Sequence, residues 1–185
     1  MKRINFFRIL FFGFVLFSVT NTFAQRSKVS VGVSPVLLMD GYGGTAHINF
    51  HHKMTDFIQA NVFIGLSNKE VASSNVEYPN DNYLFNLGYF TTLFSSPDKG
   101  ISLFLGGGAS LGLEHINQGN LELSDGSILL SEGGFVYGGF ASLDLDWFLN
   151  ESLSLTLPVN GFYHPNSNID EAMFFVGVGI RYYIN

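Results

Sequence analysis

Apolar residues alternate with polar or small residues along most of this chain, and the clearest run extends from Ile101 to Glu114. Every second residue of the run, beginning with Ile101, is Ile, Leu, Gly or Ala, and the residues between them are Ser, Phe and Gly until Glu114. Because successive side chains of a strand point to opposite faces, the run predicts one strand with an apolar face and a small, weakly polar face. A soluble sheet would carry charged residues on its second face. The pattern therefore indicates a transmembrane β-strand whose apolar face meets lipid.

Seven further segments alternate in the same way, and the connections between them vary regularly in length. The eight predicted strands are 28–34, 46–51, 58–65, 85–93, 101–114, 135–147, 153–160 and 174–184. The shorter connections are 53–54, 95–100 and 150–151, and the longer ones are 37–43, 67–82, 115–133 and 164–170. Outer-membrane barrels have short periplasmic turns, longer external loops and an even number of strands. We therefore predict an all-β fold, an eight-stranded antiparallel up-and-down transmembrane β-barrel with periplasmic termini.

One strand position disagrees with a regular ladder. Pro158 lies inside the seventh predicted strand. Proline has no N–H to donate to a neighbouring strand, and within sheets it is confined to edges and bulges. We therefore expect a β-bulge at Pro158.

Aromatic residues on the apolar faces gather near the predicted strand ends, as the two girdles of membrane barrels do. The predicted girdle residues are Phe50, Trp147 and Tyr182 near the periplasm and Phe85, Phe135 and Tyr137 near the outer boundary. The alternative fold is a soluble β-sandwich with these aromatics packed inside. That fold would have to explain why the polar faces carry so few Lys or Glu residues.

The first 24 residues have the composition of a secretory signal peptide. Lys2, Arg3 and Arg8 form a basic region, an apolar run covers residues 9–17, and Thr22-Phe23-Ala24 offers a small-residue cleavage site. An uncleaved anchor is the alternative, but a membrane helix needs about 20 apolar residues. We predict export through a Sec-type signal, 1–24, followed by a single barrel domain, 25–185, in the outer membrane.

Charge and cysteine content exclude several classes of function. Without the signal, the chain has six Lys and Arg residues against fifteen Asp and Glu residues. Such an acidic chain is not expected to bind nucleic acid directly, because that affinity rests on neutralising phosphates. The sequence contains no Cys, which excludes disulfides and thiolate metal sites. We expect no cofactor.

The charged residues on the predicted inner faces suggest a structural site. The predicted cluster consists of Lys28, Asp144, Asp146 and Arg181, all in the periplasmic half of the strands. Because an eight-stranded barrel is just wide enough to be filled by side chains, these charges are expected to meet and plug the lumen. A proton or ion path is the functional alternative.

The histidines do not form a predicted metal site. His47 and His51 share one face of a strand, but a spacing of four residues separates them by about 13 Å. A lipid-modifying barrel enzyme would have to use His115 or His164 with Ser131 or Ser167, and no motif fixes their geometry. We predict no catalytic residues.

Two stretches, Gly134 to Leu149 and Val176 to Asn185, resemble the TraO family of conjugative-transposon proteins of Bacteroidetes, which is associated with the mating apparatus. The resemblance extends from about Leu84 to the end and includes the acid-rich loop before Tyr137 and the Leu149-Asn150-Glu151 turn. Separately, Gly179 to Ile184 is similar to the C-terminal signal read by the outer-membrane insertion machinery.

The resemblance implies a non-enzymatic component of a transfer apparatus, with outer-membrane lipid and other transfer proteins as its partners. The barrel would act as an anchor, and the loops 67–82 and 115–133 would present an acidic surface to partners. Two alternatives stay open: a general structural or adhesion barrel of the OmpX or OmpA kind, and the barrel enzyme described above.

Overall fold

The computed structural model describes residues 28–52, 56–71, 76–98, 100–123, 125–129 and 133–184. Most of these residues lie in strands, with one short 3-10 segment, η1 (Asn117–Gly119). The strands are β1 (Val29–Leu38), β2 (Gly41–His52), β3 (Asp56–Val71), β4 (Val76–Ser95), β5 (Ile101–Ile116), β6 (Gly133–Phe148), β7 (Leu153–Tyr163), β8 (Ala172–Gly177) and β9 (Gly179–Ile184). The predicted signal, 1–24, and the predicted turn at 53–54 lie outside the described residues.

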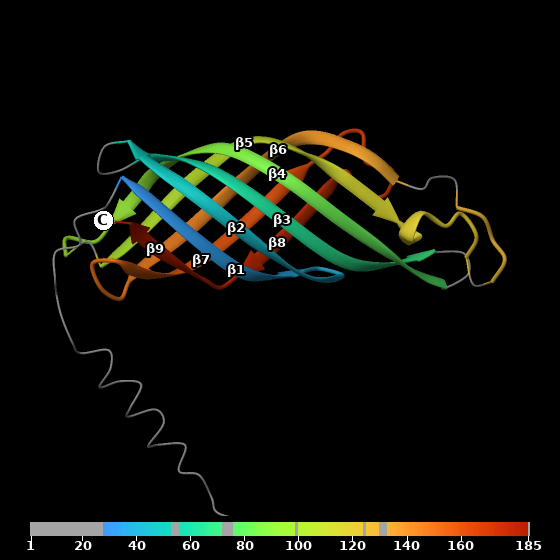
Figure 1. Cartoon of the computed structure of the whole chain (residues 1–185), viewed down its shortest axis with the longest axis horizontal. Helices are drawn as coiled ribbons and strands as arrows, with labels where there is room; N and C mark the ends of the chain where they lie inside the picture. The colour runs from blue at the N-terminus through green and yellow to red at the C-terminus, as the bar shows by residue number, and fades with distance from the viewer. Residues whose placement is uncertain are drawn as a thin grey trace, which may run out of the picture.

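The strands close into a single antiparallel barrel (Figure 1). β1 completes the closure by pairing with β2 on one side and with β8 and β9 on the other. β8 and β9 are the two halves of one last strand, because β7 pairs with both in a single register. The prediction of an eight-stranded, antiparallel, up-and-down barrel is therefore confirmed. The described residues include no helix that is long and apolar enough to span a membrane.

The two ends of the barrel differ, as Figure 1 shows. One end carries the start of β1, the end of β9 and the connections before β3, β5 and β7, and we call it the turn end. The opposite end carries the connections before β2, β4, β6 and β8, and we call it the loop end. η1 and the residues that follow it extend beyond the barrel at the loop end.

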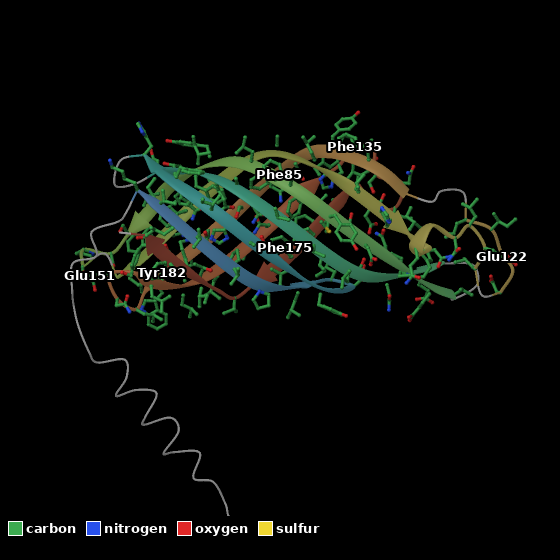
Figure 2. The ribbon with its side chains drawn as sticks, in the orientation of Figure 1. Phe85, Glu122, Phe135, Glu151, Phe175 and Tyr182 are labelled. Carbon is green, nitrogen blue, oxygen red and sulfur yellow. The ribbon has the colours of Figure 1, made fainter. Side chains whose placement is uncertain are left out.

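The inside and outside of the barrel are reversed relative to a soluble protein. On β5, Leu105, Leu111 and Leu113 are 43–47% exposed, whereas Ser102 and Ser110 are fully buried. The other strands follow the same alternation, so aliphatic and aromatic side chains cover the outer wall (Figure 2). An exposed apolar surface of this extent is suited to lipid and not to water.

Two of the predicted loops are instead strand. The connection expected at 37–43 is a two-residue turn between Leu38 and Gly41. Gly41 and Gly43 lie within β2, so close to β3 that a methyl group at either would overlap a carbonyl oxygen of that strand. Within the polar stretch 67–82, the described residues 67–71 and 76–82 form the paired ends of β3 and β4, whose register continues to the Val71–Val76 pair. Polar side chains alone suggested a loop there, but they are equally compatible with a hairpin whose backbone groups pair with one another.

The bulge expected at Pro158 is absent from the described strands, and the prediction was wrong. β6 pairs with β7 in one register across Pro158. The interruption lies in the neighbouring last strand at Val178, which separates β8 from β9. A Cβ added at Gly177 would lie 2.9 Å from the Pro35 carbonyl oxygen and 3.3 Å from Pro158 Cγ. Two prolines without N–H groups thus flank one site on the last strand. The regular ladder is interrupted there, although the Val178 N–H still donates to the Pro35 carbonyl at 3.3 Å.

Phenylalanine rings fill the middle of the lumen. Phe57 stacks on Phe90 with ring centroids 4.8 Å apart, and Phe63 stacks on Phe175 at 5.1 Å. The whole buried cluster consists of Val36, Phe57, Phe63, Leu84, Phe90, Phe104, Val136, Phe140, Phe162 and Phe175. Stacked aromatic pairs add about 0.5–1.5 kcal/mol beyond the burial of their area. Small residues on the inner face of β5 leave space for these rings.

Gly106 provides the sharpest test of this packing. A methyl group at Gly106 would overlap the Phe90 ring. We expect Gly106→Ala to lower the free energy of unfolding by about 1–3 kcal/mol, the usual cost of overpacking a core. Urea unfolding of the protein refolded in detergent micelles measures this change.

The matched control is Gly134→Ala on β6, where the added methyl group would have no described heavy atom within 4 Å. We expect this variant to unfold at the wild-type urea concentration. Equal midpoints for the two variants would contradict the packing of Phe90 on Gly106.

Candidate functional site

The lumen near the turn end holds a buried ion cluster. Arg181 on β9 donates a hydrogen bond from Nη1 to Asp146 Oδ2 at 2.9 Å and another from Nη2 to Asp144 Oδ2. Ser154 Oγ donates to Asp146 Oδ1 at 2.6 Å, and the Tyr183 hydroxyl donates to Asp146 Oδ2. The alternation of β6 turns both aspartates inward. The neighbouring strand β7 brings Ser154 alongside, and the next strand, β9, brings Arg181 and Tyr183.

Three of the four residues predicted for this cluster come together, and Lys28 does not. Lys28 precedes β1 and is exposed, because the inward positions begin only at Ser30. In its place, His47 on β2 accepts a hydrogen bond from Arg181 Nε at 3.3 Å. The Arg181 guanidinium also lies 5.5 Å from the centre of the Phe57 ring. The sequence did not identify His47, Ser154 or Tyr183, because their contacts depend on strand register and barrel closure.

The described lumen does not resemble a proton or ion path. The phenylalanine cluster lies against the ion cluster through Phe57 and continues toward the loop end. Phe57, Phe63 and Phe104 are fully buried. His51 forms a hydrogen bond with Ser30 at 2.9 Å, whereas His47 forms one with Arg181, so the two histidines have different partners. Within the described ranges, no three His, Asp or Glu residues are placed to hold one metal ion.

The predicted girdle residues lie on the outer wall. Phe50 and Tyr182 are 48% and 52% exposed on the turn-end half of β2 and β9, and Trp147 is half-buried near the end of β6. Phe135 and Tyr137 are exposed on the first part of β6, toward the loop end, with ring centroids 6.4 Å apart.

Phe85 is placed differently from the prediction. Figure 2 shows it between Tyr182 and Phe135 along the barrel axis. The reason is that β4 begins at Val76 at the loop end, so a long part of the strand lies between that end and Phe85. The sequence prediction treated residues up to 82 as a loop and so placed Phe85 at a strand end.

The loop end is covered by residues 164–171, which we call the mouth segment. His164 Nε2 lies 2.9 Å from Ser110 Oγ on β5. Ser167 Oγ donates to the Glu114 carboxylate, with distances of 3.1 and 3.2 Å to its two oxygens. Side chains of β5 therefore fasten the mouth segment across the lumen.

Two other parts of the loop end hold the same segment. Asn166 Nδ2 donates to the Phe135 carbonyl of β6 at 2.7 Å. Lys69, near the end of β3, forms ion pairs with Asp40 of the β1–β2 turn at 2.6 Å and with Asp170 of the mouth segment. Lys69 thereby links three separate connections of the loop end.

A cavity of about 280 Å³ lies beneath these contacts and opens at the loop end. The polar and charged residues that line it are Asp40, Ser67, Lys69, Asn80, Asn82, Glu114, His164, Ser167 and Asp170. Burial lowers the pKa of His164, so its imidazole is neutral at pH 7. We call this the mouth cavity. Sequence analysis did not identify it, because its polar residues alone come from five strands or connections far apart in the chain.

The candidate enzyme residues do not form a triad in the described structure. His164 pairs with Ser110 and not with Ser167, whose hydroxyl donates to Glu114. The His115 ring instead packs edge-on against Tyr83. Ser131 lies outside the described residues. Ser110 is fully buried on the inner wall, a poor position for attack on a lipid.

A closed eight-stranded barrel with an apolar outer wall and a filled lumen defines the class of small outer-membrane β-barrels. The family model described as conjugative transposon protein TraO matches residues 38–184. The chain therefore belongs to the TraO family, and the match begins well before Leu84, where the resemblance was first apparent. A comparison with curated proteins finds no match.

Solved structures agree with the fold. Neisserial surface protein A has a TM-score of 0.60 and 10% identity, covering 84% of this chain and 96% of that protein. The N-terminal β-barrel domain of Pseudomonas aeruginosa OprF has a TM-score of 0.52 and 13% identity, covering 86% and 100%. Ail, the attachment invasion locus protein of Yersinia pestis, has a TM-score of 0.51 and 10% identity, covering 84% and 96%. At these identities the likeness establishes the fold alone.

Proposed function

We propose that this protein is a non-enzymatic outer-membrane component of a conjugative transfer apparatus, anchored by its barrel and presenting its loop end to other proteins of that apparatus. Membership of the TraO family is the observation that carries the proposal. In this orientation the turn end and both termini face the periplasm, and the loop end faces outward.

The physical features of the barrel favour an anchor over a conduit. Its lumen is occupied by the ion cluster and the phenylalanine cluster, so the described part of the barrel offers no open route for a substrate. Its loop end bears exposed acidic residues, including Glu122 and Asp125. A rigid barrel with a projecting acidic surface suits binding to another protein.

Charge reversal at the loop end tests this proposal. We expect Glu122→Lys combined with Asp125→Lys to reduce transfer frequency to that of a deletion strain. The variant barrel should still insert into the membrane and still show the heat-dependent change in gel mobility of a folded barrel. The matched control is Glu151→Lys, which is exposed at the opposite end (Figure 2) and should leave transfer unchanged.

Other phenotypes would identify the alternatives. Normal mating by the deletion strain would refute the proposal. Envelope defects or altered surface binding without a mating defect would instead support a general structural or adhesion barrel. Turnover of radiolabelled lipid A or phospholipid by the purified protein would support an enzyme.

A further inference from the structure

The mouth cavity has an excess of negative charge. Its lining contains three carboxylates, from Asp40, Glu114 and Asp170, and one ammonium group, from Lys69. Lys69 is already paired with Asp40 and Asp170. The remaining carboxylate, Glu114, is 3% exposed.

Among the described residues, the hydrogen-bond donors that contact Glu114 are neutral. Its carboxylate accepts hydrogen bonds from the Ser167 hydroxyl and from the Asn168 backbone N–H at 3.3 Å. A buried carboxylate is costly unless a positive charge or sufficient donors compensate it. Glu114 is therefore poised to accept a cationic donor that enters the cavity.

Asn80 provides a second, independent indication of a ligand. It lines the same cavity from the inner face of β4 and is 2% exposed. Its side-chain oxygen has no hydrogen-bond partner among the described residues. Buried amide oxygens without a partner are rare and costly, so the cavity contains an unused acceptor as well as a carboxylate whose donors are neutral.

The chemistry and size of the cavity define the ligand class. Carboxylate and amide oxygens are acceptors, and they match the N–H groups of a guanidinium or an ammonium. The volume of about 280 Å³ is just below the range of about 300–1,000 Å³ that is usual for whole small-molecule ligands. A single side chain fits this space better than a complete small molecule.

We propose that the mouth cavity binds an Arg or Lys side chain of a partner protein, with Glu114 as the counter-ion and the Asn80 side-chain oxygen as a further acceptor. This inference rests on the proposed function, since it specifies how the loop end recognises its partner. Charge complementarity supports it, because the mature chain is acidic and the cavity lining carries net negative charge.

Titration of the full-length barrel in micelles with N-acetyl-arginine amide tests the inference, with N-acetyl-citrulline amide as the uncharged isostere. We expect the arginine derivative to bind and to shift the NMR signal of the Asn80 side-chain amide, and the citrulline derivative to bind much more weakly. Glu114→Gln should weaken arginine binding about tenfold or more, because hydrogen bonds to charged groups contribute about 1.5–3 kcal/mol.

A second variant acts in the opposite direction. Asn80→Asp keeps the side-chain shape and adds a carboxylate, so it should strengthen arginine binding and leave citrulline binding unchanged. This variant remains informative if Glu114→Gln fails to fold. Equal affinities for arginine and citrulline, or no effect of either substitution, would overturn the inference.

Mating assays separate this inference from the proposed function. If the deletion abolishes mating but the arginine derivative does not bind, only the inference fails. If Glu114→Gln loses arginine binding and still mates normally, the cavity does not receive a side chain of a transfer protein. Loss of both binding and mating in Glu114→Gln is the expected result.

Discussion

Replacing Arg181 by Met is expected to lower the free energy of unfolding by about 3–5 kcal/mol, the usual cost of removing one partner from a buried salt bridge. Arg181 is fully buried and is bonded to both Asp144 and Asp146. Met occupies a similar volume but leaves two buried carboxylates without a compensating charge. Urea unfolding of protein refolded in micelles, followed by the fluorescence of the single tryptophan, Trp147, measures the loss.

A triple variant distinguishes the charge from the packing. Combining Arg181→Met with Asp144→Asn and Asp146→Asn removes every charge of the cluster while keeping the volume of its side chains. We expect this variant to recover much of the lost stability, because replacing a whole buried ion pair is often neutral. Equal stability of the single and triple variants would show that Arg181 contributes through packing and not through charge. Arg181 lies within Gly179 to Ile184, the stretch that is similar to the C-terminal signal read by the insertion machinery. Refolding the purified protein without that machinery ensures that the comparison measures stability and not recognition of the signal.

Replacing Leu105 by Arg is expected to prevent stable insertion. Leu105 lies near the middle of the outward row of β5, is 43% exposed, and pairs in register with Thr91 and Leu143. An Arg facing lipid near the bilayer midplane costs about 2–4 kcal/mol, a large part of the stability of a small barrel. Loss of the heat-dependent shift in gel mobility after refolding into vesicles measures this effect.

Two controls test whether depth in the bilayer is the cause. Ile101→Arg lies on the same strand and face but at the turn end, where the cost falls to about 0–1 kcal/mol. Asn120→Arg lies at the loop end and is exposed, so it should fold like the wild type. The outer wall would not be a lipid surface if Leu105→Arg folded as well as Asn120→Arg.

The faces of the strands were predictable because alternation is a local property of the extended chain. Leu105 outward and Ser102 inward follow from period two alone, and the sequence placed Asp144, Asp146 and Arg181 on inner faces for the same reason. The ends of the strands were less predictable. Polar residues in 67–82 are compatible with a loop and with a long hairpin, and only the pairing of β3 with β4 decides between them.

The interruption of the last strand at Val178 also could not be predicted from the neighbouring residues in the sequence. Pro158 by itself predicts a bulge in its own strand. The structure brings Pro35 and Pro158 to the two sides of Gly177, and the irregularity moves to the last strand. That outcome requires β1 to pair with β8 and β9. These strands lie at opposite ends of the chain, so a local stretch of sequence does not reveal the pairing.

The sequence by itself determined the class of this protein: strands of alternating polarity, eight in number, with lipid on the aliphatic side. Those properties depend on the order of neighbouring residues and on the need to pair every backbone group within a membrane. Only the tertiary structure decided which inward side chains meet. Arg181 reaches His47, and Glu114 reaches Ser167, because register and barrel closure set these long-range contacts. The mouth cavity has the same origin, since its lining is assembled from distant segments that only the closed barrel brings together.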